Sequence, residues 1–82
     1  RVDSQMAELF IERMHAVEMV FEHKKELGLP IFDAEREEEI IQKNSALIED
    51  EVIKEYYIEY IKNLMEISRE YQYRMENDAS LN

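Results

Sequence analysis

The chain has 82 residues and a net charge of −10, from 10 basic and 20 acidic side chains. It is long enough for one small domain only, and its acidity argues against nucleic acid or an anionic membrane surface as a partner. It has no cysteine, no apolar run long enough to span a membrane and no recognisable signal peptide, so we expect a cytoplasmic protein without disulfides and without a membrane partner.

The first predicted element is a long helix over about residues 3–27, with Asp3 as its N-cap. Gly28 and Pro30 follow it. Glycine readily takes the left-handed conformation that ends a helix, and proline cannot continue one, so these two residues predict a clean stop.

Two cations lie inside the apolar stripe of this predicted helix. Arg13 and Lys24 are eleven residues apart, and eleven steps of about 100° return to within about 20° of the starting direction, so both lie on one face. The apolar members of the stripe are Met6, Leu9, Phe10, Val17, Val20, Phe21 and Leu27. A cation on a core-facing position is costly without an anion beside it, so the pattern predicts an anion-binding pocket. The alternative is that both side chains reach the surface and bury only their stems.

Two further helices are predicted after residue 32. Asp33 is expected to cap a short helix over about residues 34–46, whose acidic first turns suit the positive end of the helix dipole. A long helix follows over about 50–77, with a frayed tail at 78–82. In this last helix, Ser68 and Gln72 lie one turn apart in a stripe that is otherwise apolar. Its apolar members are Ile53, Tyr57, Tyr60, Ile61, Leu64, Tyr71 and Met75.

One glycine, one proline and apolar residues at helical spacing predict an all-α, three-helix chain in the order long–short–long. At 1.5 Å per residue the long helices would span about 37–42 Å and the short one about 20 Å. Apolar surface on the long helices would therefore stay uncovered, and pairing with a second chain about a two-fold axis is the economical solution. The alternative is a monomer with long solvated ends.

Several short segments together resemble the all-helical class of chorismate mutase. They are Glu12-Arg13-Met14, Lys24, the segment GLPIFDAERE at 28–37, and Ser68 with Gln72. The set is specific although no single member is, and the resemblance runs from about Val2 to Met75. It implies one domain over residues 1–82 in an intertwined, domain-swapped homodimer. The implied reaction is the Claisen rearrangement of chorismate to prephenate, a step of phenylalanine and tyrosine biosynthesis in the shikimate pathway, with no cofactor and no metal.

The resemblance also implies which residues are catalytic. Arg13 would grip a substrate carboxylate, with Ser68 assisting. Lys24 and Gln72 would donate hydrogen bonds to the ether oxygen of the breaking C–O bond. A pericyclic step needs no proton transfer, so such a site needs no nucleophile and base, only restraint of a flexible dianion and donors where negative charge grows. Because the Gln72 amide does not titrate, we expect a rate nearly independent of pH across neutrality.

The ring hydroxyl of the substrate would be bound at the start of the second helix. Glu37 would accept it beside the backbone N–H of Asp33, and Arg36 would support the site. Enzymes of this class take a further arginine from the partner's first helix, and alignment on Arg13 places it before Arg1. We expect preceding residues to supply it; the alternative is an incomplete site with weak activity.

Other functions remain open at this point. A non-catalytic regulatory or dimerisation domain of the same fold, binding prephenate, is one alternative, and elimination of pyruvate from isochorismate is another. Glu12 and His15 have the spacing of a di-metal helical motif, but a second copy is missing from the sequence. Both His15 and His23 are expected to be solvated. We therefore expect no metal.

Overall fold

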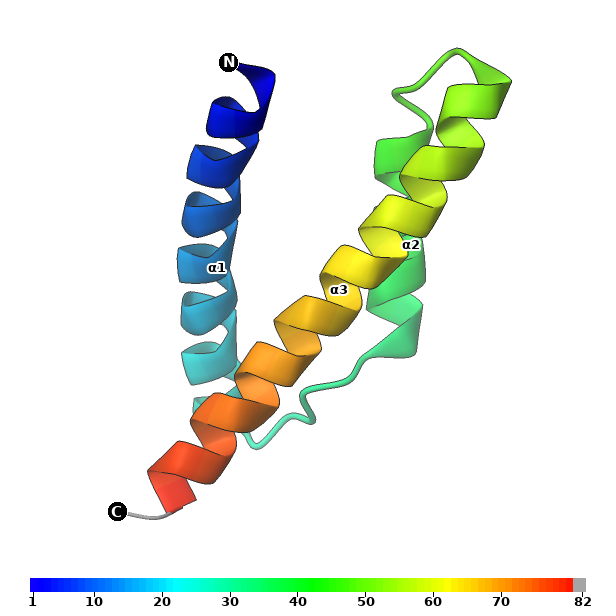
Figure 1. The fold of residues 1–82 in the computed structure, drawn as a ribbon. Coiled ribbons are helices and arrows are strands. Elements are labelled where there is room, and N and C mark those ends of the chain that lie inside the picture. Colours follow the sequence, from blue (N-terminus) through cyan, green and yellow to red (C-terminus); the bar gives the residue numbers. More distant parts are fainter. Residues whose placement is uncertain (81–82) are drawn as a thin grey trace. The chain divides into compact units, whose positions relative to one another are not determined.

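The computed structural model describes residues 1–80, and these residues form three α-helices and no strand (Figure 1). Helix α1 is Val2–Leu27, α2 is Ala34–Ser45 and α3 is Glu51–Ser80. The predicted all-α class and the long–short–long order are thereby confirmed. The observed bounds differ from the predicted ones by at most three residues.

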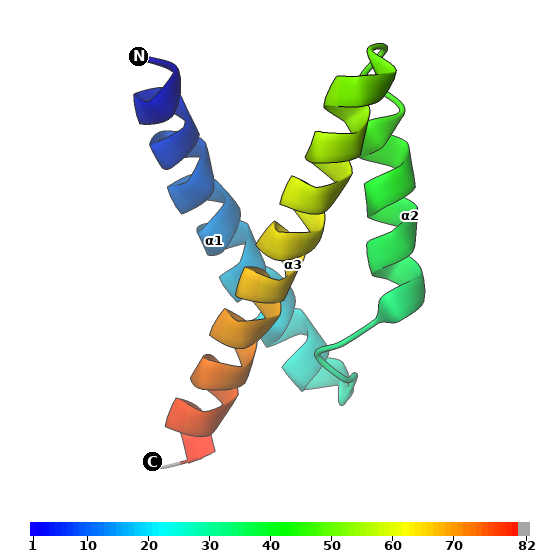
Figure 2. The same cartoon turned by 45° about the vertical axis from the view of Figure 1, so that its right-hand side comes forward.

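Two compact units make up the chain. One contains residues 1–31 together with the part of α3 that begins at Gln72, and the other contains residues 32–71. In the second unit, α2 and the N-terminal part of α3 run antiparallel and lie side by side in both ribbon views (Figures 1 and 2). The single helix α3 therefore contributes to both units, with the boundary between Tyr71 and Gln72.

Each unit buries its own apolar residues. In the first unit, Val17 and Phe21 of α1 are buried, as is Ile31 in the connection to α2. In the second unit, the buried core consists of Ile41 from α2 and Ile61 with Met65 from α3. Four partly buried residues pack against that core: Ile40, Tyr57, Ile58 and Leu64.

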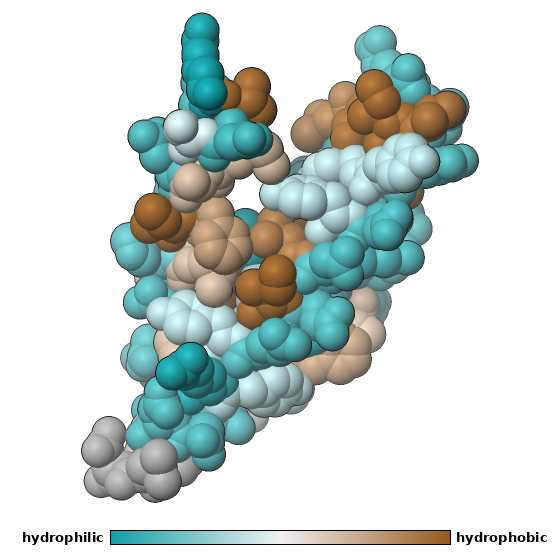
Figure 3. Space-filling view, in the orientation of Figure 1, coloured by the Kyte–Doolittle hydropathy of each residue, from teal (hydrophilic) through white to brown (hydrophobic). Residues whose placement is uncertain are grey.

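Much of the apolar stripe predicted for α1 is exposed in the single chain (Figure 3). The exposed members are Met6, Leu9, Phe10, Val20 and Leu27. Among residues 1–80, the only other helical segment of this unit is the end of α3 from Gln72. That segment is about 13 Å long, whereas α1 is about 39 Å long. The N-terminal half of α1 therefore has no helix of its own unit along its length. In α3, Ile53 and Tyr60 are likewise exposed, although the stripe placed them inside.

The two ends of α1 differ in how well the sequence predicts them. Gly28 takes the left-handed conformation, with φ 67° and ψ 27°, and its N–H donates to the carbonyl of Lys25 at 3.3 Å. The predicted stop at Gly28 is thus confirmed. The predicted N-cap was wrong: Arg1 occupies that position without a side-chain cap, and Asp3 lies in the first turn. An aspartate favours a helix start from either place, because in the first turn it also meets the positive end of the dipole.

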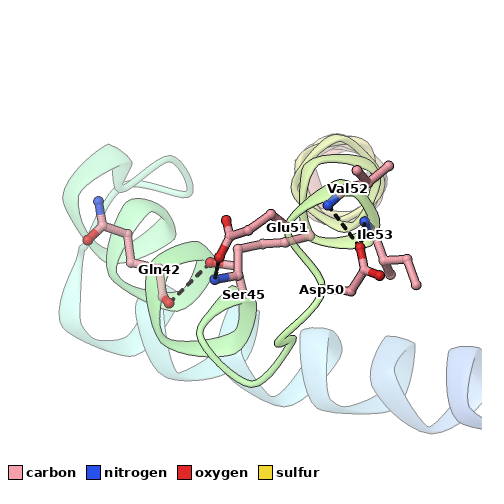
Figure 4. Close-up of polar contacts among 7 residues, drawn as sticks. Gln42, Ser45, Asp50, Glu51, Val52 and Ile53 are labelled. Carbon is pink, nitrogen blue, oxygen red and sulfur yellow. Dashed lines mark hydrogen bonds and ion pairs between the residues drawn. The ribbon is translucent and has the colours of Figure 1, made fainter.

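Side-chain caps define the starts of α2 and α3. Asp33 Oδ1 accepts from the backbone N–H of Arg36 at 3.1 Å, which confirms the predicted cap of α2. Asp50 Oδ1 accepts from the N–H of Val52 at 2.9 Å and of Ile53 at 3.0 Å (Figure 4). Each carboxylate satisfies N–H groups that have no partner within the helix, so both starts are set locally.

At its C-terminal end, α3 continues to Ser80. The tail predicted to fray from Asp78 is therefore helical at least to Ser80, while Leu81 and Asn82 lie outside the described residues. The stretch from Glu76 to Ala79 contains neither glycine nor proline, and nothing in it forces the helix to stop. None of the helices in residues 1–80 is both long enough and apolar enough to cross a membrane.

Candidate functional site

The seven predicted site residues divide between the two units. Arg13, Lys24 and Gln72 belong to the first unit, and the others belong to the second. Those of the second unit are Asp33, Arg36, Glu37 and Ser68.

Lys24 is half-buried near the C-terminal end of α1. Its ammonium nitrogen donates to the backbone carbonyl of Ile31 at 2.7 Å, so the connection after Gly28 folds back over the lysine. The sequence predicted an anion here, whereas the structure places a carbonyl oxygen. An ammonium group has three N–H donors, so one contact with Ile31 leaves capacity for a ligand oxygen.

Gln72 is the most informative residue of the first unit. It is buried, and its amide nitrogen donates to the backbone carbonyl of Val17 at 3.1 Å. Val17 lies four residues after Arg13 and seven before Lys24, on the face that these cations share. Gln72 therefore meets α1 at a level about 6 Å along the axis from Arg13 and about 10 Å from Lys24. The amide nitrogen carries two hydrogens, so Gln72 has a second N–H donor besides the one that contacts Val17.

Arg13 is half-buried on α1, one turn before Val17. Its guanidinium offers a planar set of donors suited to a carboxylate. Arg13, Lys24 and Gln72 together place two cationic donors and one amide donor in the first unit of a chain whose net charge is −10.

A cavity of about 410 Å³ opens beside Lys24 in the same unit. Its lining includes Phe21, Gly28, Ile31 and Glu76. Gln72 does not line it, so this opening reaches the lysine from the side of the α1–α2 connection. We assign no role to it in the candidate site beyond access to the Lys24 ammonium.

In the second unit, Asp33, Arg36 and Glu37 lie at the N-terminal end of α2. The Asp33 side chain is occupied as the helix cap, which leaves its backbone N–H as the group the resemblance assigned to the substrate. Arg36 is exposed, and Glu37 is half-buried. The N-terminal turn of a helix is a favourable place for an acceptor such as Glu37, because the dipole stabilises its negative charge.

Arg69 is a contact residue of Glu37 that the sequence analysis missed. Its guanidinium forms an ion pair with Glu37 Oε1 and lies over the ring of Phe32, with Cζ 4.7 Å from the ring centre. The helical spacing of the sequence could have identified Arg69. Arg69 is four residues after Met65 and three before Gln72, both buried, and the same spacing argument that selected Arg13 and Lys24 selects it.

Ser68 is buried in α3, and its hydroxyl donates to the carbonyl of Leu64 at 2.9 Å. Ile61, Met65, Ser68 and Gln72 follow one another at helical spacing and are all buried, so the predicted placement of Ser68 and Gln72 among core-facing residues is confirmed. Within residues 1–80, every buried side-chain nitrogen and oxygen has a hydrogen-bond partner. The buried polar groups of α3 are therefore compatible with a stable fold without a ligand.

The first unit contains the donor groups of Arg13, Lys24 and Gln72, and the second contains the acceptor group of Glu37. Residues 1–80 contain no cluster of three or more histidine, cysteine, aspartate or glutamate side chains that could hold a metal ion.

The chorismate mutase type II family model matches residues 1–73 of the chain. No curated protein and no solved structure matches it at a significant level. The matched range includes all seven predicted site residues and ends within α3. Extension of the domain to residue 82 stays a prediction.

Proposed function

The chain belongs to the chorismate mutase type II family, and on that premise we propose that it converts chorismate to prephenate. The reaction is an isomerisation in which one C–O bond breaks and one C–C bond forms, so no atom enters or leaves. The observation that carries the proposal is Gln72, a buried neutral donor held against Val17 on the face of α1 that bears Arg13 and Lys24.

The proposed mechanism needs two contributions from the protein. The first is restraint of a flexible dianion in its compact conformer, which we assign to Arg13 at one carboxylate with assistance from Ser68. The second is stabilisation of the negative charge that grows on the ether oxygen as the C–O bond breaks. Lys24 and Gln72 supply donors of the required kind, one charged and one neutral.

The ring hydroxyl is the third feature of the substrate that the site must recognise. We assign it to Glu37, whose carboxylate accepts a hydrogen bond, with the backbone N–H of Asp33 beside it. Arg36 is exposed and supports this end of the site through its charge.

We further propose that the working form is a homodimer. The support is the exposed apolar stripe on the N-terminal half of α1, together with exposed Val52, Ile53 and Tyr56 near the start of α3. Large apolar side chains gathered along one helix are typical of a surface that another chain covers. A dimer would also allow one chain to complete the site of the other.

One assay tests the proposed function. The whole chain, with any residues that precede Arg1 in the natural protein, is incubated with chorismate, and the loss of its ultraviolet absorbance is followed. The product is then identified as prephenate. Measurable prephenate binding without turnover would contradict the enzymatic proposal and favour a regulatory domain. Release of pyruvate from isochorismate, with chorismate left intact, would favour the lyase.

A further inference from the structure

The Arg69 side chain contacts two residues at the start of α2. Its Nη1 donates to Glu37 Oε1, and its guanidinium carbon lies 4.7 Å from the centre of the Phe32 ring. The Arg69 and Glu37 side chains are 27% and 21% exposed, so both are largely withdrawn from solvent. Glu37 and Arg69 are 32 residues apart in sequence, which makes this a tertiary contact.

The two contacts use different parts of the guanidinium group. A ring is contacted through the planar face, and a carboxylate through the N–H groups on the edge, so both can form at the same time. A lysine ammonium has neither a flat face nor a fixed fork of donors. The site therefore suits arginine in particular, beyond a requirement for positive charge.

The positions of Phe32 and Glu37 explain what the double contact does. Phe32 precedes the cap residue Asp33, and Glu37 lies in the first turns of α2. Arg69 thus attaches the start of α2 to α3 at two points, one on each side of the cap. Glutamate has several rotamers, and fixing one of them before a ligand arrives removes an entropic cost from binding.

We propose that Arg69 is a positioning residue that holds the Glu37 carboxylate ready for the ring hydroxyl of the substrate, an inference that rests on the mutase function proposed above. Arg69 donates to Oε1, and the carboxylate has a second oxygen, Oε2, with which it accepts the hydroxyl. Arg69 acts through Glu37 and does not itself touch the substrate. The ring hydroxyl is not a reacting atom, so this contact stabilises ground state and transition state alike.

The test is a double-mutant cycle on kcat/KM. Arg69→Met, which keeps an apolar stem, is expected to lower kcat/KM by about 10- to 100-fold through a misplaced Glu37. The loss should appear mainly in KM, because the lost contact stabilises the bound substrate and the transition state equally. Arg69→Lys should lie between Arg69→Met and the wild type. Arg74→Met, on an exposed position of the same helix, should be unchanged.

The decisive comparison adds Arg69→Met to Glu37→Ala. If Arg69 acts through Glu37, the second change should lower kcat/KM by less than about 2-fold in that background. Thermal unfolding of all variants separates this coupling from a loss of stability, and Arg69→Lys covers the case in which Arg69→Met does not fold.

Two kinds of result overturn the inference, and they are distinguishable. The positioning role would be excluded, and the mutase function would stand, if Arg69→Lys kept the wild-type kcat/KM. The same would follow if the loss of kcat/KM in the double variant equalled the product of the losses in the two single variants. Absence of chorismate turnover in the wild type would remove the proposed function, and the positioning role would fall with it.

Discussion

The amide nitrogen of Gln72 donates to the backbone carbonyl of Val17 across 3.1 Å, in a buried contact between residues 55 apart in sequence. It holds the end of α3 against α1 at a level between Arg13 and Lys24. A glutamine that serves both as a structural link and as a donor can be tested by exchanging its amide for a carboxyl group.

Gln72→Glu is expected to make catalysis depend on pH. A carboxyl group donates only when protonated, and burial raises its pKa because the charged form is disfavoured. Activity should therefore be present below that pKa and fall about tenfold per pH unit above it. The wild type is the control, and its kcat should be nearly constant between about pH 6 and about pH 8 because the amide does not titrate. A steep loss of wild-type kcat in that range would contradict the role of Gln72.

Lys24→Ala should abolish most of the turnover. Removal of a donor aimed at developing charge lowers kcat on the order of 10²- to 10³-fold. The hydrogen bond to Ile31 is lost as well, with an expected effect of about 1 kcal/mol on the free energy of unfolding. Chorismate kinetics and circular dichroism are the measurements, with Lys43→Ala at an exposed position of α2 as the control. A variant with helix content and kcat both unchanged would show that another group serves the ether oxygen.

Asp33→Ala should destabilise the chain through its helix cap. The carboxylate that accepts from the Arg36 N–H is lost, and such a cap contributes about 1 kcal/mol. Asp33→Asn keeps an acceptor oxygen and should unfold at nearly the same urea concentration as the wild type. Equal stability of Asp33→Ala and Asp33→Asn would mean that Asp33 caps α2 without stabilising the fold.

Leu9→Glu is expected to weaken the proposed dimer. Leu9 lies on the exposed stripe of α1, and a charge there would have to be desolvated in an interface. Sedimentation velocity over a range of concentrations should show a dimer for the wild type and a shift toward monomer for the variant. Glu12→Gln, an exposed change on the same helix, should sediment as the wild type does. A wild type that stays monomeric at every concentration would exclude the dimer.

Local features of the sequence predicted most of the helix boundaries. Gly28 and Asp33 act through their own backbone and side-chain chemistry, and their roles depend on residues no more than four positions away. Asp3 was misassigned because an aspartate stabilises either the cap or the first turn, and sequence does not distinguish the two. Helical spacing also placed Ser68 and Gln72 in a buried stripe, where the structure has them.

Burial on α1 was predicted less well, for a physical reason. Periodicity identifies the apolar face of a helix, but exposure depends on what lies against that face. Val17 and Phe21 are covered and Leu9 is exposed, although all three share one pattern.

The sequence by itself therefore determined the all-α class, the order of the helices and most of their ends. It also identified the polar residues that lie within the apolar stripes, which are Arg13, Lys24, Ser68 and Gln72. Only the tertiary structure decided which polar groups meet. The Val17 partner of Gln72 and the Glu37 partner of Arg69 lie 55 and 32 residues away, beyond the reach of any helical repeat. Contacts of that kind follow from the packing of one helix on another, because a repeat specifies a direction around an axis and leaves the identity of the neighbour open.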